Sequence, residues 1–290
     1  MGLFGSFLGK RKVDIKKRFT LLKEGVSGTM SKFYQAMDRE NNREVGLKII
    51  NLEKMKQVED RYVKFGKAGK KPSEGEIAMS LSHPYIVETY EYGFTTNNEP
   101  YLVMEYLEGT GLNNILMLKQ DLLAGARLPY IRQCAEALKY VHEHDYIHRD
   151  YCPRNLLFSG DGRTLKLIDF GLTVPNRPPF TDPGGRTGTP NYMAPELVRR
   201  KPTSTMVDIF AFGVTMYEFC SRQLPWPSGA SLAAMTHDQP PVKITTLVPN
   251  LNPKLAEAIH QCILPDPRNR PTIQDFIKMI SRIETDTIKS

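Results

Sequence analysis

Two carboxylates and one amide lie close to one another in sequence, near the middle of the chain: Asp150, Asn155 and Asp169. The first two belong to the stretch His148-Arg149-Asp150-Tyr151-Cys152-Pro153-Arg154-Asn155, and Asp169 opens the triplet Asp169-Phe170-Gly171 after a short predicted hairpin. A carboxylate can accept the proton of a hydroxyl group. A second carboxylate and an amide oxygen are hard ligands of the kind that Mg²⁺ prefers. Side chains of these types could therefore accept a proton and ligate a divalent cation.

The octapeptide reads H-R-D-x-x-x-x-N and, with D-F-G behind it, resembles the catalytic and metal-binding loops of eukaryotic-type protein kinases of the serine/threonine family. The resemblance implies that Asp150 accepts the proton of the substrate hydroxyl. It also implies that Asn155 and Asp169 hold Mg²⁺ while ATP supplies the phosphoryl group. Further motifs occur in order over about residues 19–283. They imply an α+β, two-lobed protein kinase fold, with a small β-rich N-lobe carrying helix αC and a larger, mostly helical C-lobe.

The catalytic loop departs from the family pattern at one position. Serine/threonine kinases carry a lysine two residues after the aspartate, where it neutralises the γ-phosphate, and here that residue is Cys152. Arg154 stands where tyrosine kinases place an arginine, and we expect it to take over the charge because a guanidinium stays ionised and binds phosphate well. The alternative is that the charge is lost and turnover is slow. Cys152 itself is read either as a buried small residue or as a redox-sensitive thiol.

A degenerate Gly-rich loop follows the first strand predicted for the N-lobe. Of the three family glycines only Gly28 is present, because Val26 and Ser31 occupy the other two places and Phe33 the valine place. An alternative register uses Gly25 with Gly28. Since glycines let the backbone approach phosphates closely, the substitutions predict a stiffer lid with poorer phosphate contacts.

The strand predicted over residues 44–50 contains Lys48, which matches the V-A-I-K lysine that grips the α- and β-phosphates. Gly46 replaces the usual alanine beneath the adenine. Residues 101–109 resemble the kinase hinge, in which Met104 is the gatekeeper, the backbone of the next residues meets adenine, and a leucine after the catalytic loop forms the floor. The residues that the resemblance assigns to ATP binding are Val26, Gly28, Ser31, Phe33, Gly46, Lys48, Met104, Glu105, Leu107 and Leu157.

Helix αC is expected at residues 72–79. By its distance from the following H-P-x-I-V segment, Glu74 is the better partner for Lys48 and Glu76 the lesser one. Gly75 lowers helix stability by about 1 kcal/mol relative to alanine, which predicts an adjustable αC.

Two helices are predicted around the catalytic loop. Apolar residues at helical spacing over residues 131–141 predict an amphipathic helix that resembles αE. Residues 206–220 are apolar nearly all round, which indicates a buried helix, and Asp208 inside it resembles the αF aspartate that braces the catalytic-loop backbone.

Residues 169–196 read as an activation segment, an irregular loop rich in proline and glycine. Its G-T-x-x-Y-M-A-P-E ending is typical of serine/threonine kinases and implies that Thr189 contacts Asp150 and helps to select Ser or Thr. Thr181 and Thr187 are candidate phosphosites or unmodified loop residues. Nearer the end of the chain, Arg270 is expected to pair with Glu196.

Composition supports a globular chain of 290 residues with a net charge of +7. We expect one kinase domain with a basic leader at residues 1–18, an N-lobe at 19–107 and a C-lobe at 108–290. No motif predicts a nucleic-acid partner, and no apolar run is long enough to span a membrane. Four widely spaced cysteines suit reduced thiols in the cytoplasm.

The leader has three interpretations. Its apolar residues followed by lysines and arginines favour contact with an anionic membrane surface, and its first six residues fit a myristoylation pattern. Alternatively, it packs on the N-lobe or frays.

The predicted partners are protein substrates, with MgATP as phosphoryl donor. The rival interpretations are a pseudokinase that binds nucleotide with weak or no transfer, a small-molecule kinase of related fold, and a membrane-anchored scaffold.

Overall fold

The computed structural model describes residues 12–25, 31–53, 71–118, 121–226 and 239–288. These residues form two compact units. The smaller unit contains residues 12–25 and 31–53 together with Ser73–Ser82 and Val87–Leu107, and the larger unit contains residues 71–72, His83–Ile86 and the described residues from Glu108 onward.

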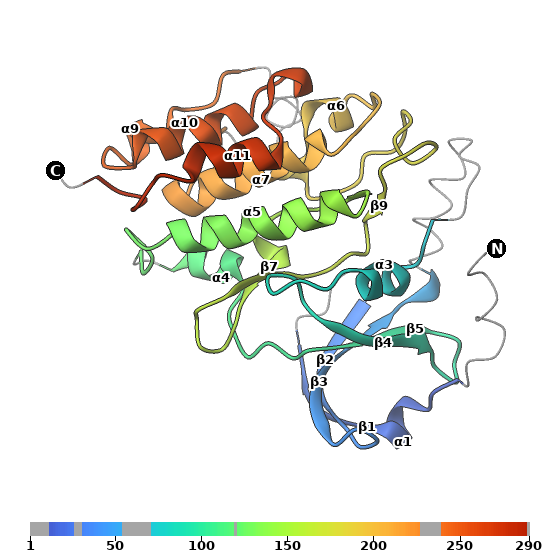
Figure 1. Ribbon diagram of the computed structural model, residues 1–290. Coiled ribbons are helices and arrows are strands. Elements are labelled where there is room, and N and C mark those ends of the chain that lie inside the picture. Colours follow the sequence, from blue (N-terminus) through green and yellow to red (C-terminus); the bar gives the residue numbers. More distant parts are fainter. Residues whose placement is uncertain (1–11, 26–30, 54–70, 119–120, 227–238, 289–290) are drawn as a thin grey trace. The chain divides into compact units, whose positions relative to one another are not determined.

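The smaller unit is built on one antiparallel sheet of five strands in the order β1-β2-β3-β5-β4 (Figure 1). The strands are β1 (Phe19–Glu24), β2 (Ser31–Asp38), β3 (Arg43–Ile50), β4 (Thr89–Phe94) and β5 (Pro100–Met104). Four of the strands contribute buried apolar side chains to one core. These side chains are Phe19, Ala36, Val45, Leu47, Tyr101 and Val103. The first predicted strand of the N-lobe and the strand predicted over residues 44–50 are confirmed as β1 and β3.

Residues 12–18 pack on this sheet. Val13 exchanges backbone hydrogen bonds with Phe94 O and Thr96 N, both 3.0 Å long, and leads into the short helix α1 (Ile15–Arg18). The Arg18 guanidinium is buried and donates to both carboxylate oxygens of Asp38, at 3.1 and 2.8 Å, and to both of Glu91, at 2.9 Å each. This part of the predicted leader therefore belongs to the smaller unit, and residues 1–11 lie outside the described part.

Helix α3 (Glu74–Ser80) begins with a capping box, in which the Ser73 side chain accepts from Glu76 N and the Glu76 carboxylate accepts from Ser73 N. A Cβ atom at Gly75 would come within 2.5 Å of Tyr92 Cδ2 and 2.6 Å of Tyr92 Cβ. The glycine thus lets α3 lie directly against β4, a role that helix propensity did not predict. Most of the charged stretch that precedes α3 lies outside the described residues.

The larger unit is mostly helical, with two small sheets of two strands each. Its helices are α4 (Leu112–Met117), α5 (Leu128–Glu143), α6 (Pro195–Val198), α7 (Met206–Ser221), α9 (Ile244–Leu247), α10 (Pro253–Cys262) and α11 (Ile273–Ile280). The strands pair as β6 (Tyr146–Ile147) with β9 (Val174–Pro175) and β7 (Leu156–Phe158) with β8 (Leu165–Leu167). Short 3₁₀ turns occur at Pro153–Asn155, Pro190–Tyr192 and Pro267–Asn269.

Helix α7 runs through the core of the larger unit, beside α10, with α11 packed between α10 and α5 (Figure 1). Its Phe210, Phe212 and Phe219 side chains are at most 1% exposed. The predictions of an amphipathic helix before the catalytic loop and a buried helix after the activation segment are both confirmed, as α5 and α7. A sheet-rich smaller unit and a helical larger unit confirm the predicted α+β class.

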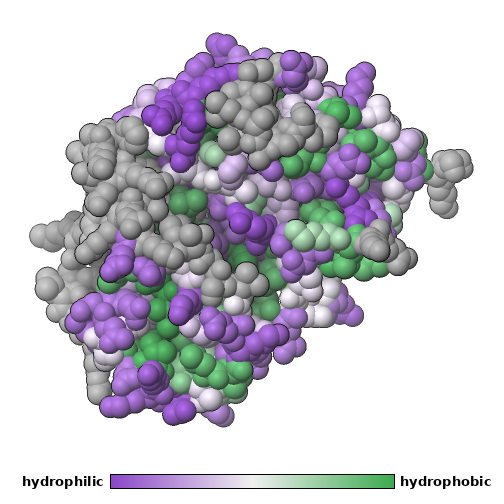
Figure 2. Space-filling view, turned by 180° about the vertical axis from the view of Figure 1, so that it is seen from behind, coloured by the Kyte–Doolittle hydropathy of each residue, from purple (hydrophilic) through white to green (hydrophobic). Residues whose placement is uncertain are grey.

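Figure 2 shows apolar patches scattered among polar residues on one face. Within the described ranges, no helix has the length and hydropathy that crossing a bilayer requires. All four cysteines are buried as free thiols.

Candidate active site

The backbone of the catalytic loop is held by a carboxylate from the buried helix α7. Asp208 Oδ2 accepts from His148 N at 2.7 Å and lies 3.0 Å from His142 Nε2, while Oδ1 accepts from Arg149 N at 2.8 Å. Asp208 is fully buried. A buried charge is tolerated when it is fully hydrogen-bonded, and here the bonds fix the start of the loop.

Arg149 and Asp169 both have left-handed backbones, with φ of 68° and 66°. Such conformations in residues other than glycine cost about 1–3 kcal/mol each and persist where surrounding contacts enforce them. The bond from Arg149 N to Asp208 and the bond from Gly171 N to Asp169 Oδ1, 3.0 Å long, are such contacts. Strained backbone of this kind is typical of active sites, and here it occurs in the loops before and after the β7–β8 hairpin.

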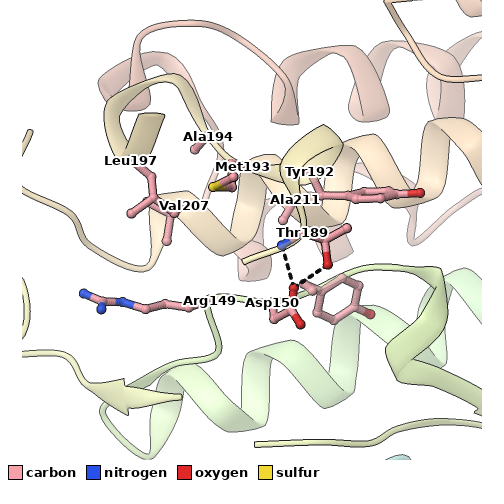
Figure 3. Close-up of a pocket in the computed structure, with 10 residues that line it drawn as sticks. Arg149, Asp150, Thr189, Tyr192, Met193, Ala194, Leu197, Val207 and Ala211 are labelled. Carbon is pink, nitrogen blue, oxygen red and sulfur yellow. Dashed lines mark hydrogen bonds between the residues drawn. The ribbon is translucent and has the colours of Figure 1, made fainter. Parts of the chain in front are cut away.

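The Asp150 carboxylate is oriented from two sides, as Figure 3 shows for one of them. Its Oδ1 accepts from Thr189 N at 2.8 Å and from Thr189 Oγ1 at 2.7 Å. Asn155 Nδ2 donates to Asp150 O at 2.8 Å and to Oδ2 at 3.2 Å. The structure therefore brings together three residues that the sequence separates by up to 39 positions.

Arg154 lies in the same hydrogen-bonded group. Its Nη2 donates to Thr189 Oγ1 at 2.9 Å, and Thr189 Oγ1 in turn donates to Asp150. Cys152 Sγ lies 3.5 Å from the same hydroxyl oxygen. Burial, and then the charge of Asp150, raise the pKa of the fully buried Cys152 thiol. The buried-residue interpretation of Cys152 therefore fits, and the redox-sensitive one does not.

The two predicted metal ligands stand on neighbouring backbone segments. The N–H of Ile168, next to Asp169, donates to Asn155 O at 2.9 Å. The Asn155 side chain is buried and its nitrogen is bonded to Asp150, so its amide oxygen is the end that can ligate a cation. An amide oxygen and a carboxylate suit Mg²⁺. Among the described residues, no group of three or more His, Cys, Asp or Glu side chains forms a separate metal site.

In the smaller unit, Lys48 forms an ion pair with Glu74. The Nζ–Oε1 distance is 2.5 Å, and both side chains are about one-tenth exposed. Glu76, the lesser candidate, serves instead in the capping box of α3.

Several residues assigned to ATP binding share one face of the sheet. Phe33 lies opposite Lys48 in the β2–β3 register, and Gly46 lies opposite Met104 in the β3–β5 register. Because side chains alternate along a strand, Gly46 and Lys48 face the same side. Phe33, Gly46, Lys48 and Met104 are thus neighbours.

The remaining ATP-binding candidates are spread more widely. Ser31 opens β2 opposite Ile50, and Glu105 follows β5, with its N–H donating to Glu88 O at 2.9 Å. Leu107 ends the smaller unit, whereas Leu157, half-buried on β7, belongs to the larger unit. Val26 and Gly28 lie outside the described residues.

One ionisable pair near Asp150 was not anticipated. The Tyr192 hydroxyl donates to Glu218 Oε2 on α7. Burial raises the pKa of Glu218, although the bond from Tyr192 opposes the change, and burial together with the Glu218 charge raises the pKa of Tyr192. Tyr192 lines the hollow next to Asp150 in Figure 3. No local sequence signal links these two residues.

The activation segment is tied to the rest of the larger unit. The Arg149 guanidinium donates to Phe180 O and to Thr203 Oγ1, the latter at 3.4 Å. At the segment's end Glu196 forms the expected pair with Arg270, through two hydrogen bonds of 2.7 and 2.9 Å.

The protein kinase domain family matches residues 22–280, and the chain belongs to that family. This confirms the resemblance inferred from the motifs. As a class, protein kinases use ATP and Mg²⁺ to phosphorylate proteins.

Curated relatives include serine/threonine kinases. The hormonally up-regulated neu tumor-associated kinase homolog A of Xenopus laevis is 31% identical over 253 residues, which are 86% of this chain and 36% of that protein. The serine/threonine-protein kinase PAK mbt of Drosophila melanogaster is 30% identical over 267 residues, 89% of this chain and 38% of that protein. The human serine/threonine-protein kinase Nek5 is 27% identical over 265 residues, 90% of this chain and 36% of that protein. The chain spans little more than a third of the length of these relatives.

Proposed function

We propose that this chain transfers the γ-phosphoryl group of MgATP to Ser or Thr hydroxyls of proteins. The observation that carries the proposal is the hydrogen bonding of Asp150. Bonds from Thr189 and Asn155 hold its carboxylate in one orientation, as a general base requires.

In the proposed reaction Asp150 accepts the hydroxyl proton while the hydroxyl oxygen bonds to the γ-phosphorus. The bond between that phosphorus and the bridging oxygen breaks, and ADP leaves. Lys48, held by Glu74, positions the α- and β-phosphates. Asn155 and Asp169 are the residues that would hold Mg²⁺, which when bound neutralises charge on the phosphate oxygens. Catalysis is then mostly positioning and charge stabilisation.

Arg154 replaces the missing lysine in this proposal. Its guanidinium donates to Thr189 Oγ1, and the same hydroxyl donates to Asp150, so Thr189 links Arg154 to the proton acceptor. From there it supplies positive charge beside the transferred phosphoryl group, which the buried Cys152 cannot do.

The test is Mg²⁺-dependent transfer of labelled γ-phosphate to the chain itself and to a generic basic protein. Wild type is compared with Asp169→Ala and with Asp161→Ala, a matched change at an exposed residue of the β7–β8 turn. We expect transfer by wild type and Asp161→Ala and loss in Asp169→Ala. Equal transfer in all three would refute the assignment of Asp169.

The pseudokinase is the second candidate, favoured by Cys152 and the degenerate Gly-rich loop. It predicts nucleotide binding without transfer in any sample. A small-molecule kinase predicts transfer to sugars or aminoglycosides rather than to peptides, so both acceptor classes belong in the assay.

Substrates and location are also proposals. We place the chain in the cytoplasm, acting on proteins, with residues 1–11 contacting anionic membranes while residues 12–18 stay on the smaller unit. Sedimentation with vesicles containing phosphatidylserine tests this contact. Binding that persists after residues 1–11 are deleted would refute it.

A further inference from the structure

The loop at residues 169–171, which carries the predicted metal ligand Asp169, is shaped by several local contacts. The N–H of Gly171 donates to Asp169 Oδ1 at 3.0 Å, a bond that orients the carboxylate. The buried Phe170 ring packs edge-on against the His148 ring, with centroids 5.5 Å apart. Thr173 N donates to Phe170 O at 3.1 Å. Each residue of the loop is therefore engaged by a neighbour.

A cation from a distant part of the chain binds the same loop. Lys71 Nζ donates to Gly171 O at 2.5 Å, although the two residues are 100 positions apart. Both belong to the larger unit, and Lys71 is half-buried. Holding a lysine side chain in one conformation costs rotamer entropy, and a charge-assisted hydrogen bond to a carbonyl offsets that cost. Gly171 is thus held at its N–H by Asp169 and at its carbonyl by Lys71.

The backbone that carries Lys71 is itself restrained. Pro72 follows directly, which fixes its own φ and keeps the residue before it out of the helical conformation. Ser73 then caps α3 through its capping box with Glu76. Lys71 therefore lies at the end of a short, stiff stretch joined to the start of α3. Its sequence neighbours are mostly lysines, and such a run by itself indicates only a solvated surface.

We propose that Lys71 is a positioning residue of the metal site, whose ammonium holds Gly171 so that Asp169 presents its carboxylate to Mg²⁺. The inference rests on the proposed use of MgATP and adds a residue that lies outside the motifs of the resemblance. Asp169 has a φ of 66°, and a strained backbone of this kind persists where contacts enforce it. Without the bond from Lys71, the Gly171 peptide is free to turn, and its N–H then leaves the Asp169 carboxylate.

Positioning and charge predict opposite effects of removing this lysine. Lys71 would not ligate the metal ion, and a positive charge by itself repels a nearby cation. Removing the charge alone would therefore strengthen Mg²⁺ binding. Removing the bond that fixes the Asp169 loop should weaken it, because groups that orient a metal ligand contribute to affinity for the metal.

The test is calorimetric binding of ADP to the full chain, in EDTA and at a series of Mg²⁺ concentrations. The variants are Lys71→Met, which removes the donor, and Lys71→Arg, which keeps it. Lys254→Met, at an exposed lysine on α10, is the matched control. Hydrogen exchange of the Gly171 amide in the ligand-free chain is the second measurement, and it needs no nucleotide.

We expect all four proteins to bind ADP equally in EDTA. Lys71→Met should need roughly tenfold more Mg²⁺ than wild type for the same gain in ADP affinity. Its Gly171 amide should also exchange faster. Lys71→Arg should keep most of the Mg²⁺ dependence, and Lys254→Met should match wild type in both measurements.

An unchanged or stronger Mg²⁺ dependence in Lys71→Met would overturn the inference, and so would wild-type exchange of the Gly171 amide. Equal weakening of ADP in EDTA and in Mg²⁺ would also contradict it, because the loss would then not concern the metal. The expected shifts without any phosphoryl transfer would refute phosphotransfer and leave this inference standing. ADP binding by wild type that does not respond to Mg²⁺ would refute both.

Discussion

Arg154, Thr189 and Asp150 form a hydrogen-bonded series in which each donates to the next. We predict that Arg154→Ala lowers kcat by about 100-fold, the usual effect of losing one preorganised donor at a reacting centre. Arg154→Lys should retain more activity because it keeps the charge, although lysine lacks the planar fork. Steady-state kinetics with varied MgATP measure both.

Arg163→Ala is the control for this substitution, because Arg163 is exposed on the turn between β7 and β8. It should leave kcat unchanged. If Arg154→Ala also turns over at the wild-type rate, the charge of the missing lysine has no replacement in this chain.

How far single residues can be predicted from the sequence depends on whether their partners are local. Asp150 and Asn155 are five positions apart in one loop, so their motif was visible. Spacing favoured Glu74 over Glu76 as the partner of Lys48, and the structure adds the reason, since Glu76 serves in the capping box of α3. The Tyr192–Glu218 bond joins a loop to a distant helix, and no sequence pattern encodes that approach.

At the scale of the element, helix propensity and tertiary packing favour different residues at position 75 of α3. Alanine at residue 75 would stabilise an isolated helix by about 1 kcal/mol. In this structure we predict the reverse, because its Cβ would overlap the Tyr92 ring. Gly75→Ala should lower the thermal midpoint and weaken MgADP binding as α3 moves and the Lys48–Glu74 pair is lost.

The matched background for this prediction is Tyr92→Gly, because alanine would keep the Cβ atom that lies within 2.6 Å of a Cβ at residue 75. With the Tyr92 side chain removed, Gly75→Ala should no longer destabilise, so a double-mutant cycle should show strong coupling. Independent, additive effects would mean that α3 tolerates the methyl group by another route.

The activation segment is the second element whose behaviour can be predicted. A phosphate on this segment would need a cationic partner, and the nearby Arg149 guanidinium already donates to Phe180 O and Thr203 Oγ1. Thr203 N donates to Thr181 O at 2.8 Å, and the Thr187 hydroxyl oxygen is buried. We therefore expect transfer without phosphorylation of this segment.

Phosphatase-treated wild type, Thr181→Ala and Thr187→Ala should all transfer phosphate at the untreated wild-type rate. Mass spectrometry confirms the absence of phosphate in each sample. Activity that is lost on treatment and returns with phosphorylation of either threonine would contradict this expectation.

At the scale of the molecule, the sequence predicted the division into a sheet-rich and a helical part because the motifs occur in a fixed order. The N-lobe was predicted to start at residue 19, and packing of the preceding leader on the N-lobe was one of the alternatives. The structure extends the smaller unit to residues 12–18, because Arg18 reaches Asp38 on β2 and Glu91 on β4. A lone arginine in a basic run gives no sign of such partners, which lie 20 and 73 positions away.

The Arg18–Asp38 pair makes a prediction about acid stability. Burial would raise the pKa of Asp38, but hydrogen bonds from Arg18, Asn41 and Glu40 N outweigh it and lower the pKa to about 2. A carboxyl group with a depressed folded pKa stabilises the fold above its unfolded pKa, near 4, and loses that contribution as pH falls towards 2. The difference corresponds to about 2 kcal/mol. We expect the free energy of unfolding of the smaller unit to fall by that order between pH 4 and pH 2.

Asp38→Asn separates this contribution from the general effect of acid. The variant should be less stable at pH 7 by about 2 kcal/mol, because it loses charge-assisted hydrogen bonds from Arg18, whose guanidinium still pairs with Glu91. Between pH 4 and pH 2 its free energy of unfolding should fall less than that of wild type, since residue 38 no longer takes up a proton. Urea unfolding at several pH values, followed by hydrogen exchange of the β2 and β4 amides, measures both effects in the unit concerned. If the free energy of unfolding fell equally with pH in the two proteins, Asp38 would have an ordinary pKa. The contacts of Arg18 would then stabilise the smaller unit independently of pH.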